Sequence, residues 1–211
     1  MKLKDQVALI TGAGRNIGKS MAKLFASEGA KIVVAEMHQG RGQAVVDEIN
    51  KSGGQAALVL GDVSKSADVQ RLVKEAVGKF GGIDILVNNA ALTDHANIFD
   101  STEEEFDKVI AVSLKGPYLV TKYVAMEMKN QGRGGKVLNF GSTSGLVGRF
   151  DGIAYAAAKA GVINMTRAMA VQLAEYGIRV NCIVPNRSGS PVGYDDDVAG
   201  SRTFQNLAGR L

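Results

Sequence analysis

The sequence contains little cysteine, proline and histidine, and each shortage excludes something. The single cysteine, Cys182, rules out an internal disulfide, and its apolar neighbours predict a small buried side chain. The two histidines, His38 and His95, fall in expected loops with no matching carboxylate or thiol pattern, so we expect no metal site. Only 3 prolines in 211 residues allow long regular elements, whereas the 26 glycines must serve turns and close approaches.

Long apolar runs and basic clusters are missing as well. No stretch approaches the roughly 18 apolar residues of a membrane span, and the N-terminus MKLKDQVALI has no long apolar signal region, so we expect a cytoplasmic protein without a membrane partner. The net charge of +4 comes from dispersed residues, without a sustained Lys/Arg run or zinc-ligand spacing, which argues against specific nucleic-acid binding. The length suits a single domain over residues 1–211.

Short β-branched runs alternate along the chain with longer helical patterns. Strands are expected at residues 7–10, 31–35, 56–60, 83–87, 136–140 and 179–184, and helices at 17–28, 41–51, 66–80, 102–129 and 155–176. The strands are nearly continuous apolar runs, which is typical of a parallel sheet covered on both faces. We therefore predict an α/β fold of Rossmann type, a doubly wound parallel sheet with helices on both faces.

A glycine-rich segment follows the first expected strand directly, and a helix begins after it. Backbone N–H groups at a helix N-terminus attract a pyrophosphate, and glycines let the backbone come close to it. Glycine-rich turns are common, so the signal depends on the strand before and the helix after. The segment is Thr11-Gly12-Ala13-Gly14-Arg15-Asn16-Ile17-Gly18, and the candidate cofactor-binding residues in it are Gly12, Arg15, Asn16, Ile17 and Gly18.

This segment resembles the TGxxxGxG loop of the classical short-chain dehydrogenases/reductases, with Asn16 where that family usually has its middle glycine. Asparagine tolerates left-handed backbone angles, so we expect the turn to survive. The resemblance covers essentially the whole chain and implies a nicotinamide-dependent oxidoreductase. It also implies that Asp62 and Val63, after the third strand, contact the adenine of the cofactor.

The segment Asn88-Asn89-Ala90-Ala91 resembles the family's NNAG, with Ala91 in place of glycine. Asn88 is expected to brace the strand ends, and Asn89 to lie beside the cofactor. Glu36, at the end of the second strand, can accept hydrogen bonds from ribose hydroxyls and would repel a 2′-phosphate, which favours NAD. Arg15 is a signal in the opposite direction, so NADP stays possible.

Tyr155 and Lys159 stand four residues apart at the start of a helix and therefore share one face. Ser142, thirteen residues before the tyrosine, lies in a segment that resembles the family's serine segment; its neighbours Thr143 and Ser144 are alternatives. A second Tyr-x-x-x-Lys, Tyr118 and Lys122, has no such serine, so we expect Tyr118 to be a helix-packing aromatic.

Hydride transfer to a carbonyl leaves charge on oxygen, so a proton must be delivered; oxidation of an alcohol runs the reverse. Tyr155 would exchange that proton, with Lys159 and the nicotinamide ring lowering its pKa and Ser142 orienting the substrate oxygen. Lys159 would also bind the nicotinamide ribose. Ser113 occupies the place of an asparagine that holds a relay water in many relatives, and its shorter side chain weakens that role.

Three further expectations concern the end of the chain, the assembly and the activity. After the sixth strand, Pro185-Asn186 replaces the family's Pro-Gly, a helix is expected through Phe204 and Leu207, and the chain stops at Leu211, so the family's C-terminal strand is expected to be missing, naturally or by truncation. The two long helices resemble those that relatives bury in homodimers or homotetramers. The predicted activity is that of a dehydrogenase/reductase acting on a secondary alcohol or ketone. The alternatives are a dinucleotide-binding sensor or subunit partner and, less favoured, a methyltransferase.

Overall fold

Six short strands form one sheet, in which every described pair of neighbours is parallel and the order is β3-β2-β1-β4-β5-β6. The structure is a computed structural model that describes residues 1–186. The strands are β1 (Val7–Thr11), β2 (Lys31–Glu36), β3 (Gln55–Leu60), β4 (Ile85–Asn88), β5 (Gly135–Phe140) and β6 (Ile178–Ile183). The helices are α1 (Asn16–Ser27), α2 (Gln39–Lys51), α3 (Ser66–Phe80), α4 (Glu103–Ile110), α5 (Gly116–Gln131) and α6 (Ile153–Leu173).

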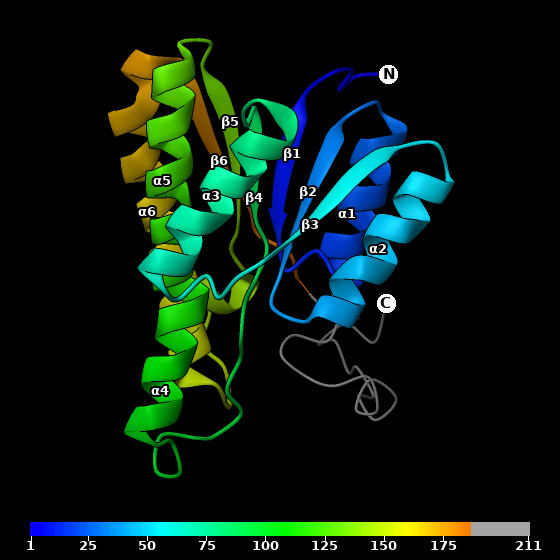
Figure 1. Cartoon of the computed structure of the whole chain (residues 1–211). Coiled ribbons are helices and arrows are strands. Elements are labelled where there is room, and N and C mark those ends of the chain that lie inside the picture. Colours follow the sequence, from blue (N-terminus) through cyan, green and yellow to red (C-terminus); the bar gives the residue numbers. More distant parts are fainter. Residues whose placement is uncertain (187–211) are drawn as a thin grey trace.

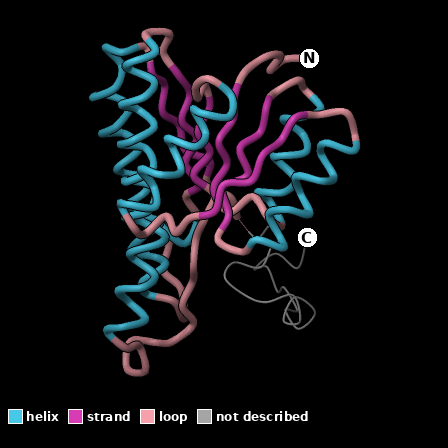
Figure 2. The backbone as a smooth tube through the Cα atoms, in the orientation of Figure 1, coloured by secondary structure: helices cyan, strands magenta, loops and turns pink. Residues whose placement is uncertain are grey.

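Helices cover both faces of the sheet (Figures 1 and 2). Successive side chains of a strand point to opposite faces: Val7 and Leu9 of β1 join the apolar cluster under α3, α5 and α6, whereas Ala8 and Ile10 join the cluster under α1 and α2. This division into two cores explains why the strands read as continuous apolar runs. The predicted doubly wound parallel sheet is confirmed.

The long helical segment expected over residues 102–129 is interrupted in the middle. A π-helical turn spans Ala111–Lys115 between α4 and α5, and the N–H of Gly116 donates to the carbonyl of Ala111. Pro117 follows and has no N–H, so it cannot continue the regular hydrogen-bond ladder back to the carbonyl of Ser113. The wider, π-helical turn therefore lies where the sequence lacks a backbone N–H donor.

The fourth strand begins two residues later than predicted. The backbone N–H of Ile83 donates to the side-chain Oε1 of Gln131 at 2.8 Å, and its carbonyl accepts from Nε2 at 2.9 Å. Because both backbone groups of Ile83 pair with this amide, pairing between β1 and β4 starts at Ile85. The helix α6 also stops before Tyr176, and a 3₁₀ turn spans Ala174–Tyr176.

A line of polar side chains crosses the otherwise apolar face of β4 and β5. The Nδ2 of Asn88 donates to Thr121 Oγ1 at 2.9 Å and to Asn139 Oδ1 at 2.8 Å. The Nδ2 of Asn139 in turn donates to Thr166 Oγ1 at 2.9 Å. These four buried side chains tie α5, β4, β5 and α6 together at one level. Asn88 braces the strand ends as expected.

The last part of the sequence lies outside the described residues. We expect a helix through Phe204 and Leu207 and no further strand after it. Both expectations concern sequence that follows residue 186. Within residues 1–186, no helix is long and apolar enough to cross a membrane.

Candidate active site

The predicted site residues follow successive strands and therefore gather at one edge of the sheet. The glycine loop follows β1, Glu36 ends β2, Asp62 follows β3, Asn89 follows β4 and Ser142 follows β5. Parallel strands all end at the same edge, which is where open α/β sheets bind their ligands. In Figure 1 the strand arrows point toward this edge, and α4 extends beyond it.

The glycine loop is packed so closely that side chains are excluded from it. A Cβ atom on Gly18 would lie 2.2 Å from the carbonyl oxygen of Gly12 and 2.6 Å from Asn89 Nδ2. That amide donates to the carbonyls of Thr11 and Gly12, both at 3.0 Å, so Asn89 holds the loop in shape. Gly12 itself has a φ of +62°, which glycine adopts at little cost.

The asparagine that replaces the family's middle glycine keeps the turn. Asn16 has a φ of +50° and is the first residue of α1, so it takes the left-handed conformation expected of it. Ile17, next to it, packs partly buried against the core under α1 and α2. The loop thus ends at a helix N-terminus whose N–H groups suit a pyrophosphate, and the residues present fit a dinucleotide.

Glu36 reaches from the end of β2 to the glycine loop. Its carboxylate accepts hydrogen bonds from the N–H of Gly14 and of Met37, both at 2.9 Å. Arg41, in the first turn of α2, is also close, since a Cβ on Gly14 would lie 3.0 Å from the Arg41 Cβ. An acidic group and a basic side chain therefore both border the loop where an adenosine ribose would lie.

The pair after β3 divides into a polar and an apolar member. The Asp62 carboxylate accepts from the N–H of Ser64 at 2.9 Å and from its hydroxyl at 2.7 Å, which fixes the turn into α3. Val63 is 8% exposed and belongs to the core, and a Cβ on Gly116 would lie 2.9 Å from its Cγ2.

Ser142 is the hydroxyl that meets Tyr155. The Ser142 side chain acts on the Tyr155 hydroxyl and lowers its pKa, and the Ser142 oxygen accepts a hydrogen bond from the N–H of Ser144 at 3.2 Å. The alternative Thr143 instead donates to Asn186 Oδ1 at 3.2 Å. Ser144 lies in the following 3₁₀ turn with its N–H committed to Ser142. Of the three candidates, the contact with the tyrosine favours Ser142.

Tyr155 and Lys159 lie on one face of α6, both almost fully buried. The Lys159 ammonium donates to the carbonyl of Phe140 at 2.7 Å and lies 5.4 Å from the centre of the Tyr155 ring. Burial lowers the pKa of Lys159 to about 8. Burial also raises the pKa of the Tyr155 hydroxyl, opposed by the hydrogen bond to Ser142 and by the charge of Arg149.

For the chain's own residues, these directions differ from the expected ones. We expected the Lys159 ammonium to lower the pKa of Tyr155, but within the protein burial has the larger effect on both groups. A second cation near the tyrosine is Arg149, which the sequence analysis did not single out.

Ser113 is fully buried, and its hydroxyl pairs with the backbone of the loop after β4. It donates to the carbonyl of Leu92 at 2.7 Å and accepts from the N–H of Leu92 at 2.8 Å. Its proton is therefore used to hold this loop, which leaves one acceptor site for the predicted relay water.

A second residue that sequence reasoning missed is Asp94. Its carboxylate is 1% exposed and accepts from the N–H of Ala154 at 3.0 Å and of Tyr155 at 2.9 Å. A negative charge at the N-terminus of α6 suits the helix dipole. Asp94 thereby fixes the first turn of the helix that carries Tyr155 and Lys159.

Two other residues singled out in the sequence, and the question of a metal site, complete the comparison. Tyr118, of the second Tyr-x-x-x-Lys, is 45% exposed on α5, so it is a surface residue and the expected packing role is wrong. Cys182 is only partly buried, on β6. Within residues 1–186, no group of three or more His, Cys, Asp or Glu side chains is arranged to hold a metal ion.

Known proteins share both the sequence pattern and the fold. The family model described as short chain dehydrogenase matches residues 6–193. The chain is 43% identical over 190 residues to an uncharacterized oxidoreductase of Thermotoga maritima, covering 90% of this chain and 74% of that protein. It is 42% identical over 185 residues to a galactitol 2-dehydrogenase of Agrobacterium fabrum, covering 88% and 71%.

Among solved structures, a short chain dehydrogenase from Mycobacterium smegmatis superposes with a TM-score of 0.86 at 34% identity, covering 88% of this chain and 78% of that one. The glycine loop, the residues at the strand ends and the tyrosine helix described above lie within the matched segment. The chain therefore belongs to the short-chain dehydrogenase/reductase family, whose members are oxidoreductases.

Proposed function

We propose that this protein transfers hydride between NAD and a secondary alcohol or ketone, with Tyr155 as the general acid/base. The observation that carries the proposal is the placement of Ser142 beside Tyr155, next to buried Lys159 and at the sheet edge that also carries the glycine loop. We take residues 1–211 to act as one catalytic domain, in the cytoplasm, where nicotinamide dinucleotides are available.

In this proposal the cofactor supplies the hydride acceptor or donor, and the chain's own residues handle the substrate oxygen. Ser142 donates a hydrogen bond to that oxygen and holds it against the phenol. Tyr155 gives a proton to it during reduction and takes one during oxidation. Lys159 would bind the nicotinamide ribose, and Gly12, Asn16 and Gly18 would let the pyrophosphate approach the start of α1. Asp62 and Val63 would border the adenine.

The first test is Tyr155→Phe, with Tyr118→Phe from the second Tyr-x-x-x-Lys as the matched control. The proton exchanger is removed while the ring is kept, so kcat should fall about 100- to 10,000-fold in Tyr155→Phe, and cofactor binding should persist. Turnover is followed by the absorbance of the reduced nicotinamide.

The substrate panel should start with sugar alcohols, since relatives are named galactitol 2-dehydrogenase and sorbitol dehydrogenase, and include a 3-oxoacyl thioester. Unchanged turnover in Tyr155→Phe would remove this residue from the mechanism. Cofactor binding without turnover of any substrate would favour the alternative, a dinucleotide-binding sensor or subunit partner.

The choice of NAD over NADP rests on Glu36, whose carboxylate borders the glycine loop and would repel a 2′-phosphate. Arg15 and Arg41 near that loop act in the opposite direction. Glu36→Gln keeps an acceptor for Gly14 but removes the charge, so the ratio of Kd values should shift about tenfold toward NADPH. Fluorescence titrations with NADH and NADPH measure this ratio, and parent protein that already prefers NADPH would contradict the assignment.

A further inference from the structure

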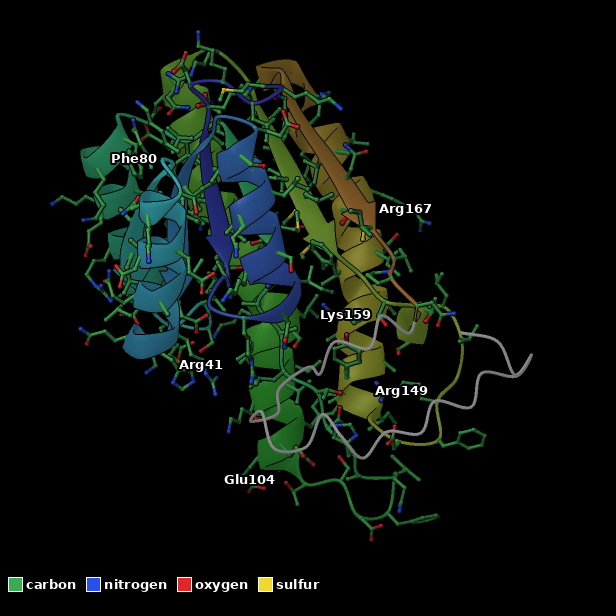
Figure 3. All side chains as sticks on the ribbon, turned by 90° about the vertical axis from the view of Figure 1, so that its right-hand side faces the viewer. Arg41, Phe80, Glu104, Arg149, Lys159 and Arg167 are labelled. Atoms are coloured by element: carbon green, nitrogen blue, oxygen red, sulfur yellow. The ribbon has the colours of Figure 1, made fainter. Side chains whose placement is uncertain are left out.

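Tyr155 has a positively charged neighbour that comes from outside its own helix. The guanidinium carbon of Arg149, in the loop between β5 and α6, lies 5.3 Å from the centre of the Tyr155 ring. This distance is within the range of cation–π attraction. Figure 3 labels Arg149 beside the first turns of α6, with Lys159 further along the same helix.

The position of this guanidinium is fixed by its surroundings. Its Nη2 lies 2.9 Å from Asp151 Oδ1, and the Arg149 side chain is only 22% exposed. The other carboxylate oxygen of Asp151 lies 3.3 Å from His95 Nδ1, which connects the pair to the loop after β4. An arginine held by a carboxylate and packed on a ring has lost most of its freedom to move.

Gly152 makes room for this arrangement. A Cβ atom at Gly152 would lie 3.1 Å from the guanidinium carbon of Arg149 and 2.7 Å from the carbonyl oxygen of Asp94. Its φ of +70° turns the chain into α6 immediately after Asp151. The turn therefore brings backbone, guanidinium and ring together.

Several other charged and titratable groups lie around Tyr155. The Lys159 ammonium lies 5.4 Å from the centre of the same ring, about as close as the Arg149 guanidinium. Asp94 accepts a hydrogen bond from the backbone N–H of Tyr155, and Ser142 offers a neutral hydroxyl. Asp151 contacts both Arg149 and His95. Cys182 acts on Lys159. The guanidinium differs from these groups in that it stays positive at every pH at which tyrosine ionises.

We propose that Arg149 is a positioning residue of the site: held by Asp151 and the Gly152 turn, it fixes the Tyr155 ring and adds a second positive charge, beside that of Lys159, that stabilises the phenolate. This inference rests on the proposed function, because the phenolate matters to catalysis only if Tyr155 exchanges the substrate proton. The ionisation itself can be measured without any turnover.

The test is the alkaline titration of tyrosinate absorbance in the full-length protein. The chain has 5 tyrosines and no tryptophan, so this absorbance is free of indole background. The step of Tyr155 is obtained by subtracting the curve of the Tyr155→Phe protein. The same subtraction is made for Arg149→Met, which removes the charge but keeps an apolar chain, and for Arg149→Lys. The control is Arg167→Met, which changes an exposed arginine on α6, the helix that carries Tyr155.

Removing a cation favours the neutral phenol, so the midpoint of the Tyr155 step should rise in Arg149→Met. It should return toward the parent value in Arg149→Lys and stay unchanged in Arg167→Met. Asp151→Asn is the opposite arm: it leaves the guanidinium without its counter-charge, so the midpoint should fall. A Tyr155 midpoint that moves in neither Arg149→Met nor Asp151→Asn, with both proteins folded by circular dichroism, overturns the proposal.

Activity then separates this inference from the proposed function. If Tyr155 is the general base, kcat/KM for alcohol oxidation in Arg149→Met should fall about three- to tenfold at pH values below the midpoint of the Tyr155 step. The pH profile of kcat/KM should be displaced to higher pH. If Tyr155→Phe leaves turnover intact, the proposed function fails, yet the titration still decides whether Arg149 acts on the phenol. An altered titration with an undisplaced pH profile would contradict the catalytic part of the inference.

Discussion

Lys159 illustrates how much a single residue of the site can weaken the fold. Its side chain is 3% exposed, its ammonium donates to one backbone carbonyl, and burial lowers its pKa from 10.5 to about 8. A buried ammonium without a carboxylate partner is unfavourable, and the group responds by releasing its proton more readily. The site therefore holds a residue that stability alone would not select.

Lys159→Met should accordingly stabilise the protein and abolish the proposed turnover. The folded pKa lies below the unfolded value, so the destabilisation is fully present below pH about 8 and is relieved as the pH rises to about 10.5. We expect a gain of about 1–3 kcal/mol at neutral pH that shrinks in the alkaline range. Urea unfolding at neutral pH and at a pH of about 10.5 measures this gain in stability.

The matched control is Lys74→Met, which changes an exposed lysine on α3 and should alter stability by less than about 0.5 kcal/mol. A Lys159→Met protein that is less stable than the parent at neutral pH would show that the hydrogen bond to Phe140 outweighs the burial of the charge.

Sequence reasoning could predict the site residues whose neighbours follow from their spacing along the chain. It missed those that a loop brings next to a helix in the folded protein. Tyr155 and Lys159 share a helix face because they are four residues apart, and the glycine loop is fixed by the strand and helix that flank it. Arg149 and Asp94 act on α6 from two different loops. Which side chain such loops bring to a helix depends on tertiary packing, and no local period encodes it.

At the scale of elements, the junction between β1 and α1 should tolerate no side chain at Gly18. A Cβ there would lie 2.2 Å from a backbone carbonyl, so Gly18→Ala must displace the glycine loop. We expect a loss of more than about 2 kcal/mol and weakened dinucleotide binding. Thermal unfolding and cofactor titration measure the two effects.

Gly78→Ala provides the comparison, because Gly78 lies inside α3 and a Cβ there meets nothing within 4 Å. This variant should be more stable than the parent by about 0.5–1 kcal/mol, since alanine restricts the unfolded chain and favours helix. Equal effects of the two substitutions would refute the close packing of the loop.

Element boundaries were predictable to within a few residues, except where a side chain or a missing donor intervened. The periodicity of residues 102–129 predicted one continuous helical segment. However, Pro117 lacks a backbone N–H, and a π-helical turn precedes α5. Gln131 similarly occupies both backbone groups of Ile83 and delays β4. Apolar periodicity carries no information about either event.

At the scale of the whole molecule, α5 and α6 expose apolar side chains on the side away from the sheet. Met126 is 54% exposed and Val171 80% exposed. Exposed apolar side chains on two neighbouring helices suit a subunit interface, and we propose that the protein is a homodimer or homotetramer that pairs through this surface.

Val171→Asp should therefore dissociate the oligomer, because a carboxylate in an apolar interface loses its hydration without a partner. Leu24→Asp, at a 58% exposed position of α1 on the other face of the sheet, should leave the assembly intact. Sedimentation at working concentration distinguishes the outcomes, and a parent protein that is purely monomeric would refute the proposed assembly.

The polar line through Asn88, Thr121, Asn139 and Thr166 has a consequence for how the sheet assembles. If β5 were displaced by one residue, Leu138 would replace Asn139 opposite Asn88, and the amides would face hydrocarbon. Each buried polar group that is left without a hydrogen-bond partner destabilises the fold by about 1–3 kcal/mol. Misaligned sheets are thus disfavoured during folding, and the alignment that survives is the one in which the serine following β5 and the asparagine following β4 emerge at matching heights.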